Sequence, residues 1–297
     1  MSLYASQGFI QKLPRSPVPM PSPAPHAGHH EPDPVLVLPA QPPVLSAIER
    51  SKQLAAHSAV DEFVTPNMKI IGIGSGSTVP YVVERIVAQG ADANRDRIFV
   101  PTGFQSKALI LNSKLNLGDV EQFGDIDVTI DGADEVDSIE RGLNCIKGGG
   151  ACQLREKVLA EAAKTWVVVA DHRKNSDVLG TNFKPGVPIE VVPFAYLQVL
   201  SRLHHMGSPD AKLRMAVAKA GPVVSDNGMF IIDAPFPPEK LEDPAKLLHE
   251  IKLITGVVEV GLFCKMARAC YFGNEDGTVT VKWNDGRVQK IDADRTP

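Results

Sequence analysis

The sequence predicts an α/β fold with a doubly wound, mostly parallel, Rossmann-like sheet and an inserted ferredoxin-like α+β domain. From residue 46 to about 186, short β-branched runs alternate with amphipathic helical patterns, the order typical of a parallel sheet. From 187 to 263 the expected order changes to β-α-β-β-α-β. We therefore expect one domain formed by 46–186 plus 264–297, with a second domain, 187–263, inserted into it.

Composition narrows the possible functions. The 297 residues carry a net charge of −4, so a broad nucleic-acid or acidic-membrane footprint is not expected. No apolar run approaches the length of a membrane helix. The four cysteines show no metal-ligand spacing, which favours reduced thiols in a cytoplasmic compartment and predicts no metal site.

Residues 1–45 differ from the rest, because the first 43 hold 11 of the chain's 24 prolines. Such a segment buries too little apolar surface to offset its ordering entropy, so we expect a disordered arm. Its histidines at 26, 29 and 30 could bind a metal, but they are interpreted as incidental. Lys12 and Arg15 leave organellar targeting open as the less favoured alternative.

The predicted domain begins with a helix over residues 46–64, whose start is marked by a Ser46–Glu49 capping box. A strand over 69–73 leads into the loop 74–78, GSGST, and a helix over 79–88. A Gly/Ser loop ahead of a helix N-terminus offers backbone N–H groups to an anion. The glycine spacing is too short for a dinucleotide-binding fingerprint. The loop is therefore interpreted as a binding site for a phosphate monoester, with a purely structural turn as the alternative.

Further strands are expected at 98–100, 120–123, 127–130 and 165–170, with helices at 105–112 and 151–164. The loop 74–78, Thr102, Asp131 and Asp171 each follow a strand. In a parallel sheet these strand ends share one edge, where ligands bind.

The inserted domain is expected to contain strands at 188–192, 212–218 and 256–263, helices at 194–206 and 243–254, and a hairpin at 223–234. Strands near Tyr271 and over 278–283 should return to the first sheet. The insertion would close the site or form a subunit interface.

The stretch 131–156 gathers most of the candidate chemistry. Four acids, at 131, 134, 135 and 137, are followed by Lys147, three glycines and Glu156. This combination suits acid–base chemistry on a small polar substrate. An acidic loop followed by a surface lysine and a flexible turn is the alternative.

Seven ordered motifs between residues 46 and 283 resemble the type A ribose-5-phosphate isomerases, particularly the fungal members. The motifs are GIGSGSTVPYVVERI (72–86), PTGFQS (101–106), DGADEVD (131–137), IKGGGACQLREK (146–157), VVVADHRK (167–174), VPIEVVPFAY (187–196) and GVVEVGLF (256–263). The resemblance implies reversible interconversion of D-ribose 5-phosphate and D-ribulose 5-phosphate without metal or organic cofactor. It also implies a homodimer or homotetramer.

The resemblance further implies the site residues. The catalytic set is Glu156, Asp131, Asp134 and Lys147, with Glu156 as the base that moves the carbon-bound proton. The substrate-binding set is Ser75, Gly76, Ser77, Thr78, Asp131, Gly132, Ala133, Asp134, Lys147, Gly148, Gly149, Gly150, Lys174 and Lys52.

Other positions near the motifs receive structural roles. We interpret Cys152 as a packing residue, and Val260, where many members carry histidine, receives no catalytic role. Arg155 and Lys157 are expected at the surface or an interface.

Two other functions remain open at this stage. One is a non-catalytic sugar-phosphate sensor, and the other is an acyl or coenzyme-A transferase of related architecture.

Overall fold

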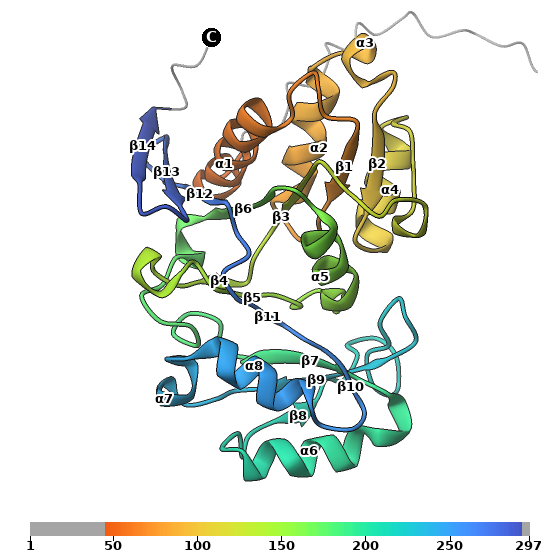
Figure 1. Cartoon of the computed structure of the whole chain (residues 1–297), viewed down its shortest axis with the longest axis vertical. Helices are drawn as coiled ribbons and strands as arrows, with labels where there is room; N and C mark the ends of the chain where they lie inside the picture. Colours follow the sequence, from red (N-terminus) through yellow and green to blue (C-terminus); the bar gives the residue numbers. More distant parts are fainter. Residues whose placement is uncertain (1–44, 293–297) are drawn as a thin grey trace, which may run out of the picture. The chain divides into compact units, whose positions relative to one another are not determined.

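The computed structural model describes residues 45–292, and its largest sheet has seven strands, drawn in the upper half of Figure 1. The strand order is β14-β13-β12-β6-β3-β1-β2. The parallel strands are β1 (Ile70–Ile73), β2 (Ile98–Pro101), β3 (Val128–Asp131), β6 (Trp166–Asp171) and β12 (Ala269–Gly273). The antiparallel hairpin β13 (Thr278–Trp283) and β14 (Val288–Asp292) extends one edge, as predicted for the return to the first sheet.

Apolar side chains project from both faces of this sheet. Both faces must therefore be covered by other elements, which explains the double winding. Along β6, Val167 and Val169 face α1 and α2, whereas Trp166 and Val168 belong to the core on the opposite face. The helices are α1 (Ala47–Phe63), α2 (Val79–Ala88), α3 (Ala91–Asn94), α4 (Phe104–Asn112) and α5 (Gln153–Ala162). Figure 1 shows α1 and α2 on one side of the sheet and α5 on the other.

Helix α1 starts where the capping signal predicts, but only half of the box forms. The Ser46 hydroxyl accepts a hydrogen bond from the Glu49 N–H at 3.2 Å. The Glu49 carboxylate turns instead to the Lys52 ammonium (2.6 Å) and the Tyr81 hydroxyl (2.7 Å). Charged and phenolic donors thus replace the backbone N–H as partners of that carboxylate.

The segment 187–263 contains a separate antiparallel sheet with the order β10-β7-β9-β8. Its strands are β7 (Val187–Val191), β8 (Lys212–Leu213), β9 (Phe230–Ala234) and β10 (Val257–Val260). Its helices are α6 (Tyr196–His205), α7 (Pro238–Leu241) and α8 (Pro244–Lys252). This order confirms the ferredoxin-like α+β expectation, while the domain boundaries stay a prediction. We call this segment the inserted module.

A three-stranded antiparallel sheet, absent from the sequence prediction, has the order β11-β5-β4. It consists of β4 (Glu135–Val136), β5 (Cys145–Ile146) and β11 (Leu262–Phe263). Each strand is two residues long, which is too short for a periodicity to be read from sequence. The sheet joins the central 131–156 stretch to the end of the inserted module.

Two strand predictions were wrong in part or in full. Residues predicted as a strand at 120–123 form a 3₁₀ helix, Val120–Gln122, because the Gln122 side chain accepts from the Asp119 N–H at 2.8 Å. The strand predicted over 212–218 ends at Leu213, and only isolated bridges, Met215–Pro222 and Val224–Phe230, continue the pairing. The remaining 3₁₀ helices are Ile139–Arg141, His172–Lys174 and Pro193–Ala195.

The predictions for the proline-rich arm and its histidines lie outside the described residues, apart from residue 45. Within 45–292, no helix is long and apolar enough to cross a membrane.

Candidate active site

A pocket opens at the carboxyl ends of the parallel strands, as the strand-edge argument predicts. Its empty volume is about 500 Å³ including the open mouth. The lining comprises Ser75, Gly76, Ser77, Thr78, Gly132, Ala133, Asp134, Lys147, Gly148, Gly149, Gly150, Glu156, Ala170, Asp171 and Lys174. Polar groups from four separate segments of the chain therefore converge on one small cavity.

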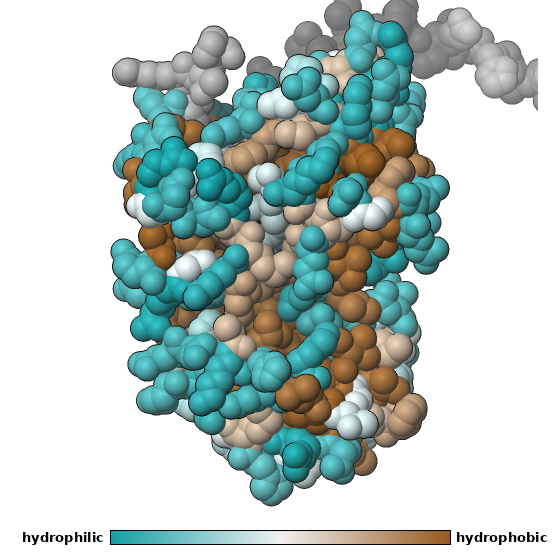
Figure 2. Space-filling view, viewed as in Figure 1, coloured by the Kyte–Doolittle hydropathy of each residue, from teal (hydrophilic) through white to brown (hydrophobic). Residues whose placement is uncertain are grey.

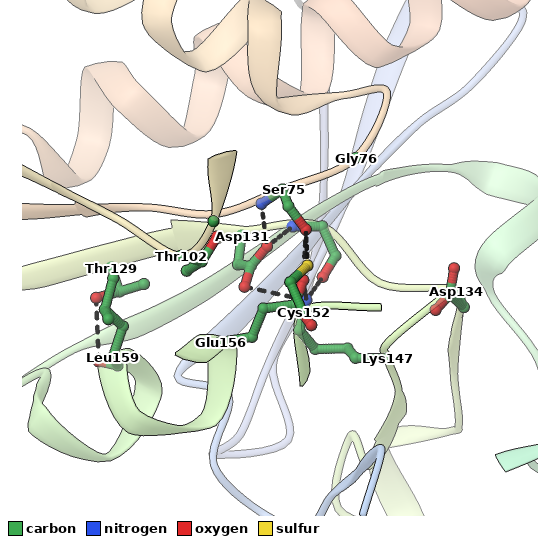
Figure 3. Close-up of polar contacts among 12 residues, drawn as sticks. Ser75, Gly76, Thr102, Thr129, Asp131, Asp134, Lys147, Cys152, Glu156 and Leu159 are labelled. Atoms are coloured by element: carbon green, nitrogen blue, oxygen red, sulfur yellow. Dashed lines mark hydrogen bonds and ion pairs between the residues drawn. The ribbon is translucent and has the colours of Figure 1, made fainter. Parts of the chain in front are cut away.

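Glu156, in the first turn of α5, is a buried acid of the lining, at 2% exposure. Its Oε1 accepts a hydrogen bond from the Ser75 hydroxyl at 2.5 Å, and Cys152 Sγ lies 2.9 Å from the same hydroxyl (Figure 3). Its Oε2 has no hydrogen-bond partner among the residues described. One carboxylate oxygen is fixed and the other is unoccupied.

Lys147 compensates the charge of two buried carboxylates. Its Nζ lies 3.0 Å from Asp131 Oδ2 and 3.2 Å from Glu156 Oε1, and it also donates to the carbonyl of Gly132. Burial disfavours the charged ammonium, but the two acids outweigh this effect and raise the pKa of Lys147. The lysine is therefore a fixed positive charge within the site.

Asp131 ends β3 beneath the pocket and is fully buried, so it is not part of the lining. Its Oδ1 accepts from the N–H groups of Ser75 (2.9 Å) and Gly132 (2.7 Å). Burial raises the pKa of Asp131 to about 6, with Lys147 opposing the rise and Glu156 adding to it. A Cβ at Gly74 would lie 2.0 Å from this carboxylate, so only glycine lets β1 and β3 approach here.

The glycine loop, residues 148–150, faces Asp134. The Gly149 N–H donates to Asp134 Oδ2 at 2.7 Å, and Figure 3 shows Asp134 standing apart from the Asp131–Glu156 group. Gly148 has φ +98°, a backbone conformation that favours glycine. The two aspartates of the predicted catalytic set thus occupy different sides of the site.

Lys52 is the one predicted substrate-binding residue that the structure leaves away from the lining and the buried carboxylates. Its Nζ pairs with Glu49 at 2.6 Å on the helix α1. Lys157 was expected at the surface or an interface, and of these the surface position was wrong, because the residue is 5% exposed. Its Nζ contacts Glu259 (3.1 Å) and the carbonyl of Leu262 (2.6 Å), which anchors α5 to the inserted module.

Sequence reasoning missed two residues that contact the site loops. Gln105 of α4 accepts a hydrogen bond from the Gly76 N–H at 2.8 Å and donates one to the Gly76 carbonyl at 3.3 Å. Arg214 of the inserted module donates hydrogen bonds to the carbonyls of Gly148 and Gly149. No sequence signal marks it, since it lies about 65 residues downstream in a segment expected to be an ordinary strand.

Known proteins similar to this chain belong to the family that the sequence motifs resemble. The family model described as ribose 5-phosphate isomerase A (phosphoriboisomerase A) matches residues 98–277. A ribose-5-phosphate isomerase of Cryptococcus neoformans var. neoformans serotype D is 64% identical over 257 residues, 84% of each chain. One from Schizosaccharomyces pombe is 56% identical over 251 residues, 84% of this chain and 89% of that protein.

Solved structures similar to this chain are also ribose 5-phosphate isomerases. Ribose 5-phosphate isomerase A from Methanocaldococcus jannaschii aligns with a TM-score of 0.69 at 34% identity, covering 82% of this chain and 98% of that one. A D-ribose-5-phosphate isomerase in complex with phospho-erythronic acid aligns with a TM-score of 0.69 at 36% identity and the same coverage. The chain therefore belongs to the ribose 5-phosphate isomerase A family.

Proposed function

We propose that this protein interconverts D-ribose 5-phosphate and D-ribulose 5-phosphate through an enediolate, with Glu156 as the base. The observation that carries this proposal is the asymmetry of the Glu156 carboxylate. Oε1 is held by Ser75 and Lys147, while Oε2 has no partner among residues 45–292 and belongs to a residue of the pocket lining.

Moving the carbonyl between C1 and C2 requires a proton to leave one carbon and return to the other. A single carboxylate placed over both carbons accomplishes this, and positioned acid–base catalysis contributes roughly 10²–10⁴-fold. Holding Oε1 in place restricts the orientation of the carboxylate, and with it the position of Oε2. This preorganisation places the base near the reacting carbons.

Negative charge develops on the substrate oxygen when the carbon-bound proton leaves. Lys147 is buried in the site and stays charged, so its ammonium stabilises that developing charge. The N–H groups of the glycine loop add fixed dipoles at the same pocket wall.

Other residues of the site suit the hydroxyls and the phosphate. Asp134 in the lining, and Asp131 beneath it, serve as acceptors or donors for hydroxyl protons, including those of ring opening. The Ser75 hydroxyl is committed to Glu156, so the phosphate falls to Ser77, Thr78 and Lys174. Thr78 stands at the N-terminus of α2, where the helix dipole favours an anion.

The test is isomerisation by the purified protein in D₂O after exhaustive chelation. We expect conversion of ribose 5-phosphate with deuterium entering the sugar at C1 or C2. Absence of conversion would refute the proposal, and activity restored only by a divalent metal would refute its metal-free form.

The sensor and transferase alternatives receive no support from the comparisons. A sensor would bind the sugar phosphate without exchange of its carbon-bound hydrogen, and a transferase would require an acyl or coenzyme-A substrate. The D₂O experiment separates both from the isomerase.

We also propose that the protein is a cytoplasmic homo-oligomer. On the face drawn in Figure 2, hydrophobic surface gathers on the right-hand side, down to the inserted module. Exposed apolar side chains of that module include Phe194 (92%), Leu197 (64%) and Leu253 (72%). Apolar surface of this kind supports association. Sedimentation would resolve dimer from tetramer, and imaging of the tagged full chain would test the compartment.

A further inference from the structure

An ion pair of the inserted module contacts the glycine loop without lining the pocket. Arg214 Nη1 donates to the carbonyl oxygens of Gly148 (3.1 Å) and Gly149 (3.0 Å). Its Nε donates to Asp233 Oδ2 at 2.8 Å, and its Nη2 donates to the other oxygen of that carboxylate. The side chains of Arg214 and Asp233 are only 16% and 9% exposed, so the pair is shielded from water.

We propose that Arg214 is a positioning residue for the isomerisation, holding the peptide groups of the glycine loop in the orientation that the reaction needs. The inference rests on the proposed function. It assigns the inserted module a part in catalysis that acts through the loop and not through contact with the substrate.

Peptide geometry explains how a contact on one side of the loop acts on the other. A trans peptide is planar, so its C=O and the N–H of the next residue point in opposite directions. Fixing the Gly148 carbonyl therefore fixes the Gly149 N–H, which donates to Asp134 Oδ2 at 2.7 Å. Fixing the Gly149 carbonyl likewise directs the Gly150 N–H, which has no acceptor within residues 45–292 and remains available to a substrate oxygen.

The loop needs such a restraint because it contains three consecutive glycines. Glycine has the largest range of backbone conformations, so an unsupported loop of this kind would populate several arrangements. Its own restraints are few: the Gly148 carbonyl accepts from the Ala151 N–H at 2.9 Å, and Gly149 bonds Asp134. Two further hydrogen bonds from one rigid guanidinium reduce that freedom.

The contact requires an arginine in particular. Its planar fork of five N–H donors reaches two carbonyls and a carboxylate together, whereas a lysine ammonium lacks this geometry. Asp233 neutralises the guanidinium charge, so the pair adds little net field to the pocket. Its effect is therefore one of geometry, and a lysine that retains the charge does not replace it.

The experiment compares kcat and KM for wild type, Arg214→Lys, Asp233→Asn and Arg85→Lys. We expect Arg214→Lys to lower kcat by roughly 10- to 100-fold, the scale of a displacement of about 1 Å in an active site. KM should change much less, since the loop acts mainly on the transition state. Asp233→Asn should lower kcat by a smaller factor, because the guanidinium stays but is less firmly held.

Arg85 is the matched control, because it forms a similar two-pronged pair with Asp61 at 2.7 and 2.8 Å, between α2 and α1. Arg85→Lys should leave kcat unchanged. Thermal unfolding of each variant measures whether the fold is retained.

The outcomes separate the two proposals. An inactive wild-type protein would refute the proposed isomerase function. An active wild type with Arg214→Lys within twofold of its kcat would overturn the positioning role alone. A kcat loss that merely tracks the fraction of unfolded protein, or one shared by Arg85→Lys, would also overturn it.

Discussion

Glu135 and Glu156 are both buried acids, 21 positions apart in the sequence, yet their surroundings differ completely. Glu135, on β4, accepts hydrogen bonds from the Ser176 hydroxyl and from the N–H groups of Gly180, Thr181, Asn182 and Phe183, at 2.6 to 3.2 Å. Both of its oxygens are occupied. This carboxylate organises the loop that follows β6 and does not line the pocket described above.

Glu156 has one occupied oxygen and one unoccupied oxygen, and it lines the pocket. Leaving a buried polar atom without a partner is unfavourable, so such an atom requires an explanation such as a catalytic role. Glu135 and Glu156 therefore differ in two respects together, an unpartnered carboxylate oxygen and a place in the pocket lining. The first alone does not mark a reactive acid, because Glu190 Oε2 also lacks a partner within residues 45–292 and Glu190 does not line the pocket.

Glu156→Gln should produce the largest effect. The amide keeps the side-chain volume but cannot accept the carbon-bound proton, so kcat should fall by roughly 10²–10⁴-fold. Steady-state kinetics and circular dichroism measure activity and fold together. Near-normal turnover in a folded variant would remove Glu156 from the role of base.

Glu135→Gln should give the opposite result. The amide NH₂ would face backbone donors that now meet a carboxylate, so the free energy of unfolding should fall by about 2–4 kcal/mol. The turnover of the folded molecules should stay close to that of wild type. Urea unfolding combined with kcat per folded molecule checks this, and a catalytic loss without destabilisation would break the comparison.

Much of the fold could be predicted because its signals are local. The alternation of buried strands and helices and the Ser46 cap appear both in the sequence and in the structure. The failures have a common cause. The two-residue strands β4, β5 and β11 have no measurable periodicity, and the strand predicted at 120–123 is overridden by the side chain of Gln122.

The features of the site also divide into those that local sequence predicts and those that it does not. Lining residues that fall within contiguous motifs, such as the 74–78 loop and the glycine loop, were identified from sequence. Contacts between residues far apart in the sequence were not identified. The Arg214–Gly149 hydrogen bond and the Lys157–Glu259 pair depend on how the inserted module packs, which no local pattern encodes.

Gly74→Ala tests the close packing against Asp131, the buried acid beneath the pocket. The added Cβ would meet Asp131 Oδ1 at 2.0 Å, so either β1 or the carboxylate must shift, at a cost of about 1–3 kcal/mol. Gly124→Ala is the matched control, because its Cβ would have no neighbour within 4 Å and its φ is not positive. Thermal unfolding of both variants measures the difference, and equal stabilities would contradict the packing argument.

Protonation of Asp131 should make the stability of the protein depend on pH. Burial raises its pKa from 3.8 to about 6, so between these values the folded state binds a proton that the unfolded chain has released. The associated stabilisation is complete below pH 3.8 and is lost as the pH rises through about 6. The stability of wild type minus that of Asp131→Asn should therefore decline over this window and then level off. Denaturant unfolding at a series of pH values checks it, and a difference that rises with pH would contradict the assignment.

Cys152→Ala should have the smallest effect, although its Sγ lies 2.9 Å from the Ser75 hydroxyl. Burial and the nearby Glu156 raise the pKa of this thiol, so it stays protonated and is a poor nucleophile at neutral pH. The Ser75 hydroxyl keeps its stronger, charge-assisted bond to Glu156 without the sulfur. We expect kcat to change by less than about fivefold, below about 1 kcal/mol. A loss of two orders of magnitude in Cys152→Ala, reversed in Cys152→Ser, would instead place the thiol among the groups that hold the base.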